Sequence, residues 1–148
     1  MKTIKKMFEH LNWANQLILE TLQNAETDEK HLSLFSHILY SEQVWLTRLK
    51  GMDTSQMPIW SDGDITVCAN LIKENEENFK TLLEELVKTG LDNLITYTNS
   101  SGKEFKTSIR DILTHVALHG QYHRGQINSR LRVDGFEPVN IDYITFVR

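Results

Sequence analysis

The sequence of 148 residues contains a single cysteine, Cys68, and only two prolines, Pro58 and Pro138. One cysteine excludes a disulfide within the chain and any paired-cysteine zinc or redox motif. Because proline breaks helix interiors, the long proline-free stretches leave room for long helices. The chain is therefore not a disulfide-rich domain, and its composition allows a largely helical one.

Long hydrophobic runs and clusters of basic residues are also missing. No apolar run approaches the ~18 residues that suggest a membrane span, and residues 1–8 lack the apolar core of a signal peptide. The formal net charge is −4, whereas binding to nucleic acid depends on clustered cations that displace counterions from phosphates. We therefore expect a cytoplasmic protein that binds neither membranes nor nucleic acid, with one domain over residues 1–148.

Apolar residues recur at intervals of three and four along four stretches, a pattern that predicts amphipathic helices. The predicted helices cover residues 3–24, 28–49, 65–88 and 107–132. Asp28 is of a favoured N-cap type for the second helix, and Gly51, Gly90 and Gly135 follow helices where a left-handed residue can end them.

The remaining segments connect or cover these helices. Residues 95–107 surround an Asn-Ser-Ser-Gly sequence and predict a short hairpin or an extended loop. The loop 52–63 contains Trp60, which we expect to cover an edge of the core, and the apolar tail 136–148 should pack onto the helices. Four helices of this length predict an all-α four-helix bundle, whose long second connection leaves room for a crossover.

Three histidines, His115, His119 and His123, lie four residues apart in the last predicted helix. Residues at this spacing are rotated by only about 40° and separated by about 6 Å, so two imidazoles can point at one atom. On a helical wheel His123 lies nearest the centre of the apolar stripe, His119 is next, and His115 lies at its edge. Because bundles hold metal ions on inward-facing side chains, we predict one divalent ion on His119 and His123. His115 is a neighbour, an orienting group or a surface residue.

The alternative is that these histidines are core or boundary residues that bind no metal. Buried imidazoles need polar partners, and two adjacent ones compete for the same partners, whereas one ion satisfies both. Catalytic zinc sites commonly use three protein ligands, so a third is needed from His10, His31 or His37. We expect His31 to be exposed. Periodicity does not choose between His10 and His37, although the more uniformly apolar helix around His37 favours it slightly.

Several segments then resemble one known family along nearly the whole chain. They are LNWAN at 11–15, HIL at 37–39 followed by Glu42 and Trp45, HxxxHRGQI at 119–127 and DYI at 142–144. Together they resemble the DinB/YfiT-like superfamily of metal-binding proteins, which is distinct from the DNA polymerase of similar name. The resemblance implies an up-down-down-up four-helix bundle, a homodimer, and a nickel or zinc ion on His37, His119 and His123.

Related members use low-molecular-weight thiols, such as bacillithiol or mycothiol, in transfer or isomerisation. The resemblance therefore implies a metal-dependent thiol transferase, or else a hydrolase of small electrophiles acting on a small-molecule substrate. Three neutral imidazoles leave an ion its full charge to polarise a carbonyl, activate water or bind a thiolate. One alternative is a non-catalytic metal-binding stress-response protein whose ion stabilises the bundle. Another is a helical dimer without metal.

Five further side chains have more than one possible role. Gln126 could orient a bound water molecule or be a solvated helix residue. Glu42 could orient an imidazole, but a surface charge is the more common role of such a residue. Tyr122 and Arg124 lie away from the ligand face by helical phase, so we expect them to serve packing or a dimer contact. Cys68 could be a thiol nucleophile, but nothing near it in the sequence suggests a lowered pKa, so we expect a small buried apolar residue.

Overall fold

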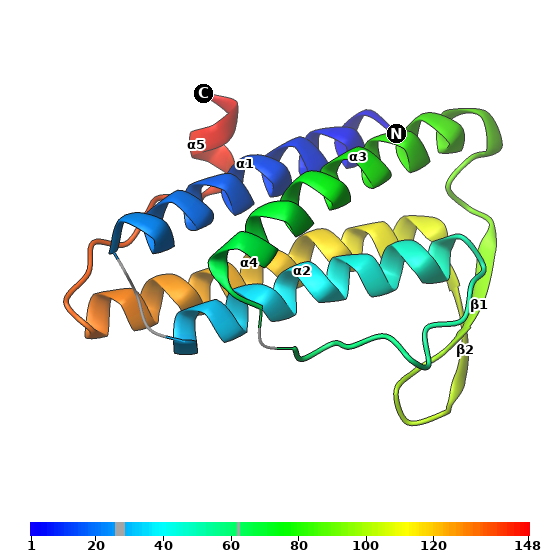
Figure 1. Cartoon of the computed structure of the whole chain (residues 1–148). Coiled ribbons are helices and arrows are strands. Elements are labelled where there is room, and N and C mark those ends of the chain that lie inside the picture. The colour runs from blue at the N-terminus through cyan, green and yellow to red at the C-terminus, as the bar shows by residue number, and fades with distance from the viewer. Residues whose placement is uncertain (26–28, 62) are drawn as a thin grey trace.

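The computed structural model describes residues 1–25, 29–61 and 63–148. Four long helices lie side by side, a two-stranded sheet lies at one end, and a short helix ends the chain (Figure 1). In chain order the elements are α1 (Lys2–Ala25), α2 (Glu29–Leu49), α3 (Ile65–Thr89), β1 (Leu94–Thr98), β2 (Glu104–Ser108), α4 (Ile109–Val133) and α5 (Tyr143–Val147). The prediction of a mostly helical chain is confirmed, with a small sheet added to it.

Local capping explains where the third and fourth long helices begin and end. The Asp64 carboxylate accepts a hydrogen bond from Val67 N at 2.9 Å, and Gly90 ends α3 with a φ of 87°. At the start of α4 the Ser108 hydroxyl accepts from Asp111 N at 3.1 Å. These bonds satisfy amide groups that have no partner inside the helix. The predicted N-cap of α2, Asp28, lies outside the described residues.

The segment between α3 and α4 is a hairpin rather than an extended loop. β1 and β2 are antiparallel, with Ile95 opposite Thr107 and Tyr97 opposite Phe105. The Asn99 side-chain oxygen accepts from Lys103 N at 2.9 Å and so closes the turn. The Tyr97 ring lies 5.1 Å from the ring of Trp45 on α2, which holds the hairpin against that helix.

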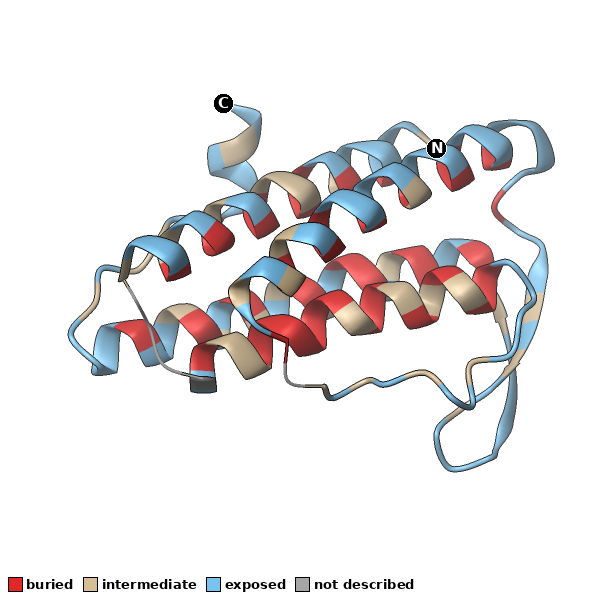
Figure 2. Ribbon diagram, in the orientation of Figure 1, coloured by how far each residue is buried: buried red, intermediate tan, exposed pale blue. Residues whose placement is uncertain are grey.

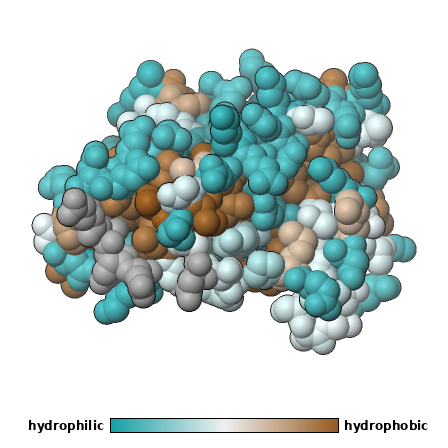
Figure 3. Space-filling view, in the orientation of Figure 1, coloured by the Kyte–Doolittle hydropathy of each residue, from teal (hydrophilic) through white to brown (hydrophobic). Residues whose placement is uncertain are grey.

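The long helices pack in a ring in which α2 contacts α3 and α4, and α1 contacts the same two helices. α2 is buried along most of its length, whereas α1 and α3 are buried mainly on the faces turned toward the other helices (Figure 2). Hydrophilic side chains cover much of the upper part of the face seen in Figure 3, and hydrophobic ones are visible between them. Within the described ranges, no helix is long and apolar enough to cross a membrane.

The core consists of two apolar clusters that adjoin a set of buried polar residues. One cluster includes Phe8, Leu46, Phe79 and Val116, and the other includes Ala14, Leu39, Ile72 and Ile127. On each of α2, α3 and α4, one buried polar residue lies in sequence between a member of the first cluster and a member of the second. On α1, a fourth buried polar residue directly follows Ala14. These four residues, which we call the buried polar layer, are Asn15, Glu42, Asn75 and Arg124.

The C-terminal tail packs onto α1, as its apolar sequence predicts. Ile141 is buried, and its carbonyl oxygen lies 2.8 Å from Nε2 of His10. The rings of Tyr143 and Phe146 lie 5.3 and 5.7 Å from the His10 ring. His10 is thus a buried residue that holds the tail. Figure 1 shows α5 beside α1.

Candidate metal centre

Three histidines from two helices converge at one place, where His37 is buried and His119 and His123 are half-buried. His37 comes from α2, and His119 and His123 come from successive turns of α4. Each offers one ring nitrogen, and these three atoms lie within 4.8 Å of one another. The close packing of α2 against α4 brings together residues that are more than eighty positions apart in sequence. The part of the chain that the structure describes contains no other such group of histidine, cysteine and carboxylate side chains.

The separation of the ring nitrogens fits a single ion. Nε2 of His119 and Nε2 of His123 are 3.2 Å apart. Two nitrogen ligands of a tetrahedral zinc ion, with bonds of about 2.0–2.1 Å, would lie about 3.3 Å apart. The His37 ring centroid lies 5.2 Å from that of His119 and 4.9 Å from that of His123. The three imidazoles are therefore placed so that they could hold one divalent ion.

Hydrogen bonds fix the opposite nitrogen on two of the three rings. Nδ1 of His37 lies 3.1 Å from the carbonyl oxygen of Ile59, and Nδ1 of His123 lies 2.7 Å from Oε1 of Gln126. Since both partners are acceptors, each Nδ1 carries the hydrogen and donates it. Nε2 then keeps its lone pair for a ligand bond. Gln126 is half-buried and contacts an imidazole, and its predicted role of orienting a bound water molecule stays a prediction.

Trp60 is a component of the site that sequence analysis did not identify. Its ring stacks on the His37 ring, with centroids 3.7 Å apart and an angle of 7° between the planes. Trp60 is 63% exposed, so the expectation that it covers an edge of the core is wrong. Because it belongs to the connection between α2 and α3, no helical periodicity relates it to the histidines. Trp60 and Ile59 together show that this connection holds His37 in place.

The environment of His119 and His37 favours their neutral imidazoles. Burial, followed by the nearby His123, His37, His115 and Arg124, lowers the pKa of His119 from 6.5 to about 4. Burial also lowers the pKa of His37, an effect partly offset by the hydrogen bond to Ile59. A histidine must be unprotonated to bind a metal ion. His119 and His37 are therefore in the form that a ligand requires near neutral pH.

Glu42 lies in the interior, and the expectation that it is a surface charge is wrong. It is 3% exposed, and its Oε2 accepts from Nδ2 of Asn15 at 3.0 Å. Nη1 of Arg124 donates to Oδ1 of the same Asn15 at 2.8 Å. Burial raises the pKa of Glu42 to about 7, against the lowering effects of Asn15, Arg124 and Asn75. The described contacts of Glu42 join it to the buried polar layer rather than to an imidazole.

Arg124 follows His123 directly and is completely buried. Burial lowers the pKa of its guanidinium to about 10, and Glu42 partly opposes this effect. A Cβ atom at Gly120 would lie only 2.9 Å from Nη1 of Arg124, so the glycine makes room for the guanidinium. Packing is the observed role of Arg124, and its burial excludes the predicted alternative of a dimer contact. Tyr122 is exposed, with its ring 5.1 Å from that of His123.

The other histidines and the cysteine lie outside the cluster. His31 is 1% exposed, and its Nε2 lies 3.0 Å from Oδ2 of Asp134 at the end of α4, so the prediction of an exposed residue is wrong. The end of α4 covers the start of α2, an arrangement that local sequence does not reveal. His115 is exposed and its ring lies 5.3 Å from Trp45. Cys68 is buried as predicted, and burial raises the pKa of its thiol.

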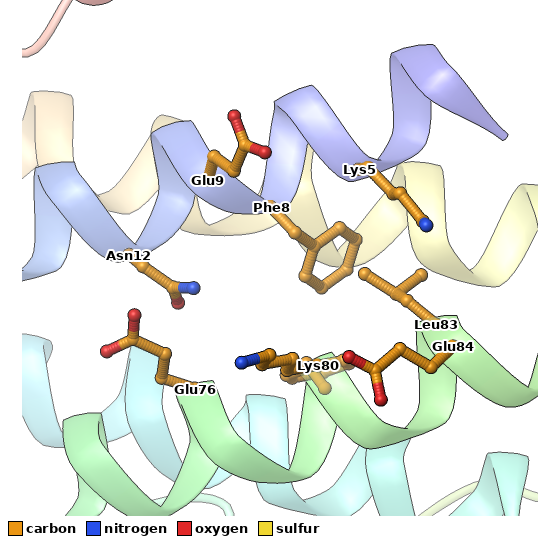
Figure 4. Close-up of a pocket in the computed structure, with 9 residues that line it drawn as sticks. Lys5, Phe8, Glu9, Asn12, Glu76, Lys80, Leu83 and Glu84 are labelled. Carbon is orange, nitrogen blue, oxygen red and sulfur yellow. The ribbon is translucent and has the colours of Figure 1, made fainter.

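A small cavity adjoins the histidines. It has a volume of about 140 Å³, and its lining includes His37, His119, Trp45 and Arg48. A larger hollow of about 320 Å³ lies between α1 and α3 (Figure 4). Its rim carries lysine and glutamate side chains around Phe8 and Leu83, and no histidine lines it. The small cavity is therefore where a molecule could meet the imidazoles.

Comparisons with known proteins identify the family of this chain. The model of the DinB family matches residues 1–148. Protein DinB of Bacillus subtilis (strain 168) is 28% identical over an alignment of 154 positions, gaps included, that covers 93% of this chain and 90% of that protein. The family resemblance of the HIL and HxxxHRGQI segments is thus confirmed over the full length, and the chain belongs to the DinB family.

Proposed function

We propose that this chain is a metal-dependent enzyme whose single divalent ion, nickel or zinc, is bound by His37, His119 and His123. The main support for this proposal is the convergence of three ring nitrogens within 4.8 Å of one another, beside a cavity that is lined by His37 and His119. Structural zinc sites generally have four protein ligands, whereas catalytic sites keep one position open. Three imidazoles beside a cavity therefore favour catalysis over a purely structural ion.

The reaction that this site supports best is attack on a small electrophile, by a low-molecular-weight thiol such as bacillithiol or by water. When bound, the ion would supply Lewis acidity for polarising a carbonyl or stabilising a thiolate. The carbonyl of Ile59 and the side chain of Gln126 would hold the imidazoles in their ligating tautomers. Trp60 would restrict rotation of the His37 ring through stacking.

Two further features belong to this proposal. The first is the up-down-down-up order of a four-helix bundle: in Figure 1, α1 and α4 run in one direction along the bundle and α2 and α3 in the other. The connection between α2 and α3 would then be the crossover. The second is a homodimer, which the family resemblance implies. Light scattering on the purified protein would test it, and a monomeric mass would contradict it.

Metal analysis of the purified protein tests the site. We expect one equivalent of nickel or zinc, and an affinity at least ~100-fold lower in His119→Ala and His123→Ala, since even removal of a supporting residue costs ~10–100-fold. His115→Ala is the matched control, because this exposed histidine is on the same helix outside the cluster. Unchanged binding in the ligand variants would refute the metal site.

A second experiment separates an enzyme from a non-catalytic metal-binding protein. Thiol conjugation and ester hydrolysis are screened with loaded protein, chelator-treated protein and His119→Ala. We expect activity only in the loaded wild-type protein. If the ion binds and raises the melting temperature but no activity depends on it, the ion stabilises the packing of α2 against α4 instead.

A further inference from the structure

We propose that Arg48 recognises an oxyanion of the substrate, a carboxylate or a phosphate, within the cavity that adjoins the histidines. This inference rests on the proposed function, because it names the class of small molecule that the site takes. The observations that carry it are the position of Arg48 in the lining of two neighbouring hollows and, among the described residues, the absence of an ion pair between its guanidinium and a carboxylate.

Arg48 belongs to the last turn of α2 and is held from several sides. Its guanidinium carbon lies 4.6 Å from the centre of the Trp45 ring and 5.1 Å from that of Tyr97. Nε donates to the Thr54 hydroxyl at 3.3 Å, and Nη2 donates to the carbonyl oxygen of Thr98 at 3.4 Å. The helix, the following loop and the hairpin, which meet at this end of the molecule (Figure 1), thus fix the side chain.

The charge of this guanidinium is poorly balanced. Arg48 is only 8% exposed, and among the described residues no carboxylate forms an ion pair with it. A buried charge is costly unless it is paired. The two aromatic rings offset part of that cost, but the two hydrogen bonds are long and use only two of the five N–H donors. Free donors in a planar fork are suited to a carboxylate or phosphate.

Arg48 also connects the histidines to a larger groove. Together with Val44 and Ile59, it lines both the 140 Å³ cavity that contains His37 and His119 and a neighbouring groove of about 310 Å³. The small cavity accommodates a reacting group and little else, so the rest of a substrate would extend into the groove past Arg48. An acidic group on that part would meet the guanidinium.

The rest of the groove is compatible with an anion. Its lining includes Thr54, Ser55 and the hairpin turn at Asn99 and Ser100, which supply hydroxyl, amide and backbone groups. It also includes one acid, Asp53, whose oxygens accept from Ser55 N at 3.1 Å and from the Ser55 hydroxyl at 2.7 Å. Asp53 is therefore held by its own loop, and no ion pair joins it to Arg48.

Nuclear magnetic resonance tests this proposal on the zinc-loaded full chain. The Nε–H signal of Arg48 is followed during titration with succinate, with inorganic phosphate and with succinamide, the uncharged analogue of succinate. We expect a saturable shift with at least one of the two acids and none with succinamide. No saturable shift with either acid, or an equal shift with succinamide, would overturn the proposal without the need for any variant.

Variants then locate the binding site. Arg48→Met should weaken binding of the acid at least ~10-fold, as expected for loss of a charge-assisted hydrogen bond. Unchanged backbone amide signals from β1 and β2 would show that the variant keeps the fold. Arg110→Gln is the matched control, because this arginine pairs with Asp92 at 2.9 Å on the surface and should leave binding unchanged. Equal loss in both variants would show nonspecific attraction and overturn the assignment.

The titration is repeated on chelator-treated protein, so that this inference and the proposed function can fail separately. A shift of Arg48 that persists without metal supports the anion site even if no metal-dependent activity is found. Conversely, a protein that binds metal in its histidines but shows no response of Arg48 to either acid keeps the metal site and loses this inference.

Discussion

At the scale of single residues, the hydrogen bond from His123 to Gln126 can be removed by one substitution, and it is expected to orient the His123 ring for metal binding. Gln126→Leu removes the acceptor of Nδ1–H, found at 2.7 Å, and frees the ring to rotate or change tautomer. We expect metal affinity to fall ~10–100-fold, the usual effect of removing such a partner. Competition with a chromogenic chelator measures it. Gln23→Leu, at an exposed position of α1, is the control, and equal affinities in the two variants would contradict this role.

Two glycines of α4 should respond in opposite ways to alanine. In an exposed helix interior, Gly→Ala stabilises by roughly 0.5–1 kcal/mol, and nothing lies within 4 Å of a Cβ atom at Gly125. At Gly120 the new atom would meet Nη1 of Arg124 at 2.9 Å and disturb its bond to Asn15. A strained charged hydrogen bond costs about 1–3 kcal/mol, so Gly120→Ala should be destabilising. Urea unfolding measures the free energy of unfolding of both variants. A Gly120→Ala variant more stable than the wild type would show that the Arg124 guanidinium is free to move away.

At the scale of secondary-structure elements, the buried polar layer joins all four long helices through Asn15, Glu42, Asn75 and Arg124. Asn75 takes part from α3, where its Nδ2 donates to the carbonyl oxygen of Leu39 at 3.0 Å. Burial raises the pKa of Glu42 from 4.5 to about 7. A carboxyl group with a raised pKa stabilises the fold while protonated, and this stabilisation is lost as the pH rises from 4.5 to about 7.

Glu42→Gln removes this ionisation. The free energy of unfolding of the variant minus that of the wild type should therefore increase between pH 4.5 and 7 and stay level above pH 7. Denaturant unfolding at several pH values measures the difference, and comparing the two proteins cancels the titration of the histidines. Glu77→Gln, at an exposed position of α3, should show no such trend. A flat difference for Glu42→Gln would mean that the carboxyl group ionises as readily in the fold as in the unfolded chain.

At the scale of the whole molecule, the metal ion would connect α2 to α4 and so couple binding to global stability. A ligand at 1,000 times its dissociation constant stabilises the folded state by about 4 kcal/mol. We therefore expect chelation to lower the melting temperature of the wild-type protein by several degrees and to have no effect on His119→Ala. Calorimetry with and without chelator measures this. An equal response of both proteins would place the ion elsewhere.

Sequence periodicity by itself determined the four long helices, because each buries a continuous apolar stripe and has local signals at its ends. The predicted limits of residues 3–24 and 65–88 differ by only a residue or so from Lys2–Ala25 and Ile65–Thr89. The Asn-Ser-Ser-Gly sequence indicated a turn between the third and fourth helices, although it left a hairpin and an extended loop as alternatives. The spacing of His119 and His123 fixed their common face, since the geometry of one helix relates them.

Only the tertiary structure decided what lies opposite that face. Helical periodicity did not decide between His10 and His37 as the third ligand, and the family resemblance selected His37. In the structure, the packing of α2 against α4 places His37 beside His119 and His123, whereas His10 lies under the C-terminal tail. The burial of Glu42, Arg124 and His31 was also invisible in the sequence, because each has a partner more than twenty residues away. Local propensity determines which face of a helix is apolar, but the partners that make a buried polar or charged side chain tolerable come from other helices.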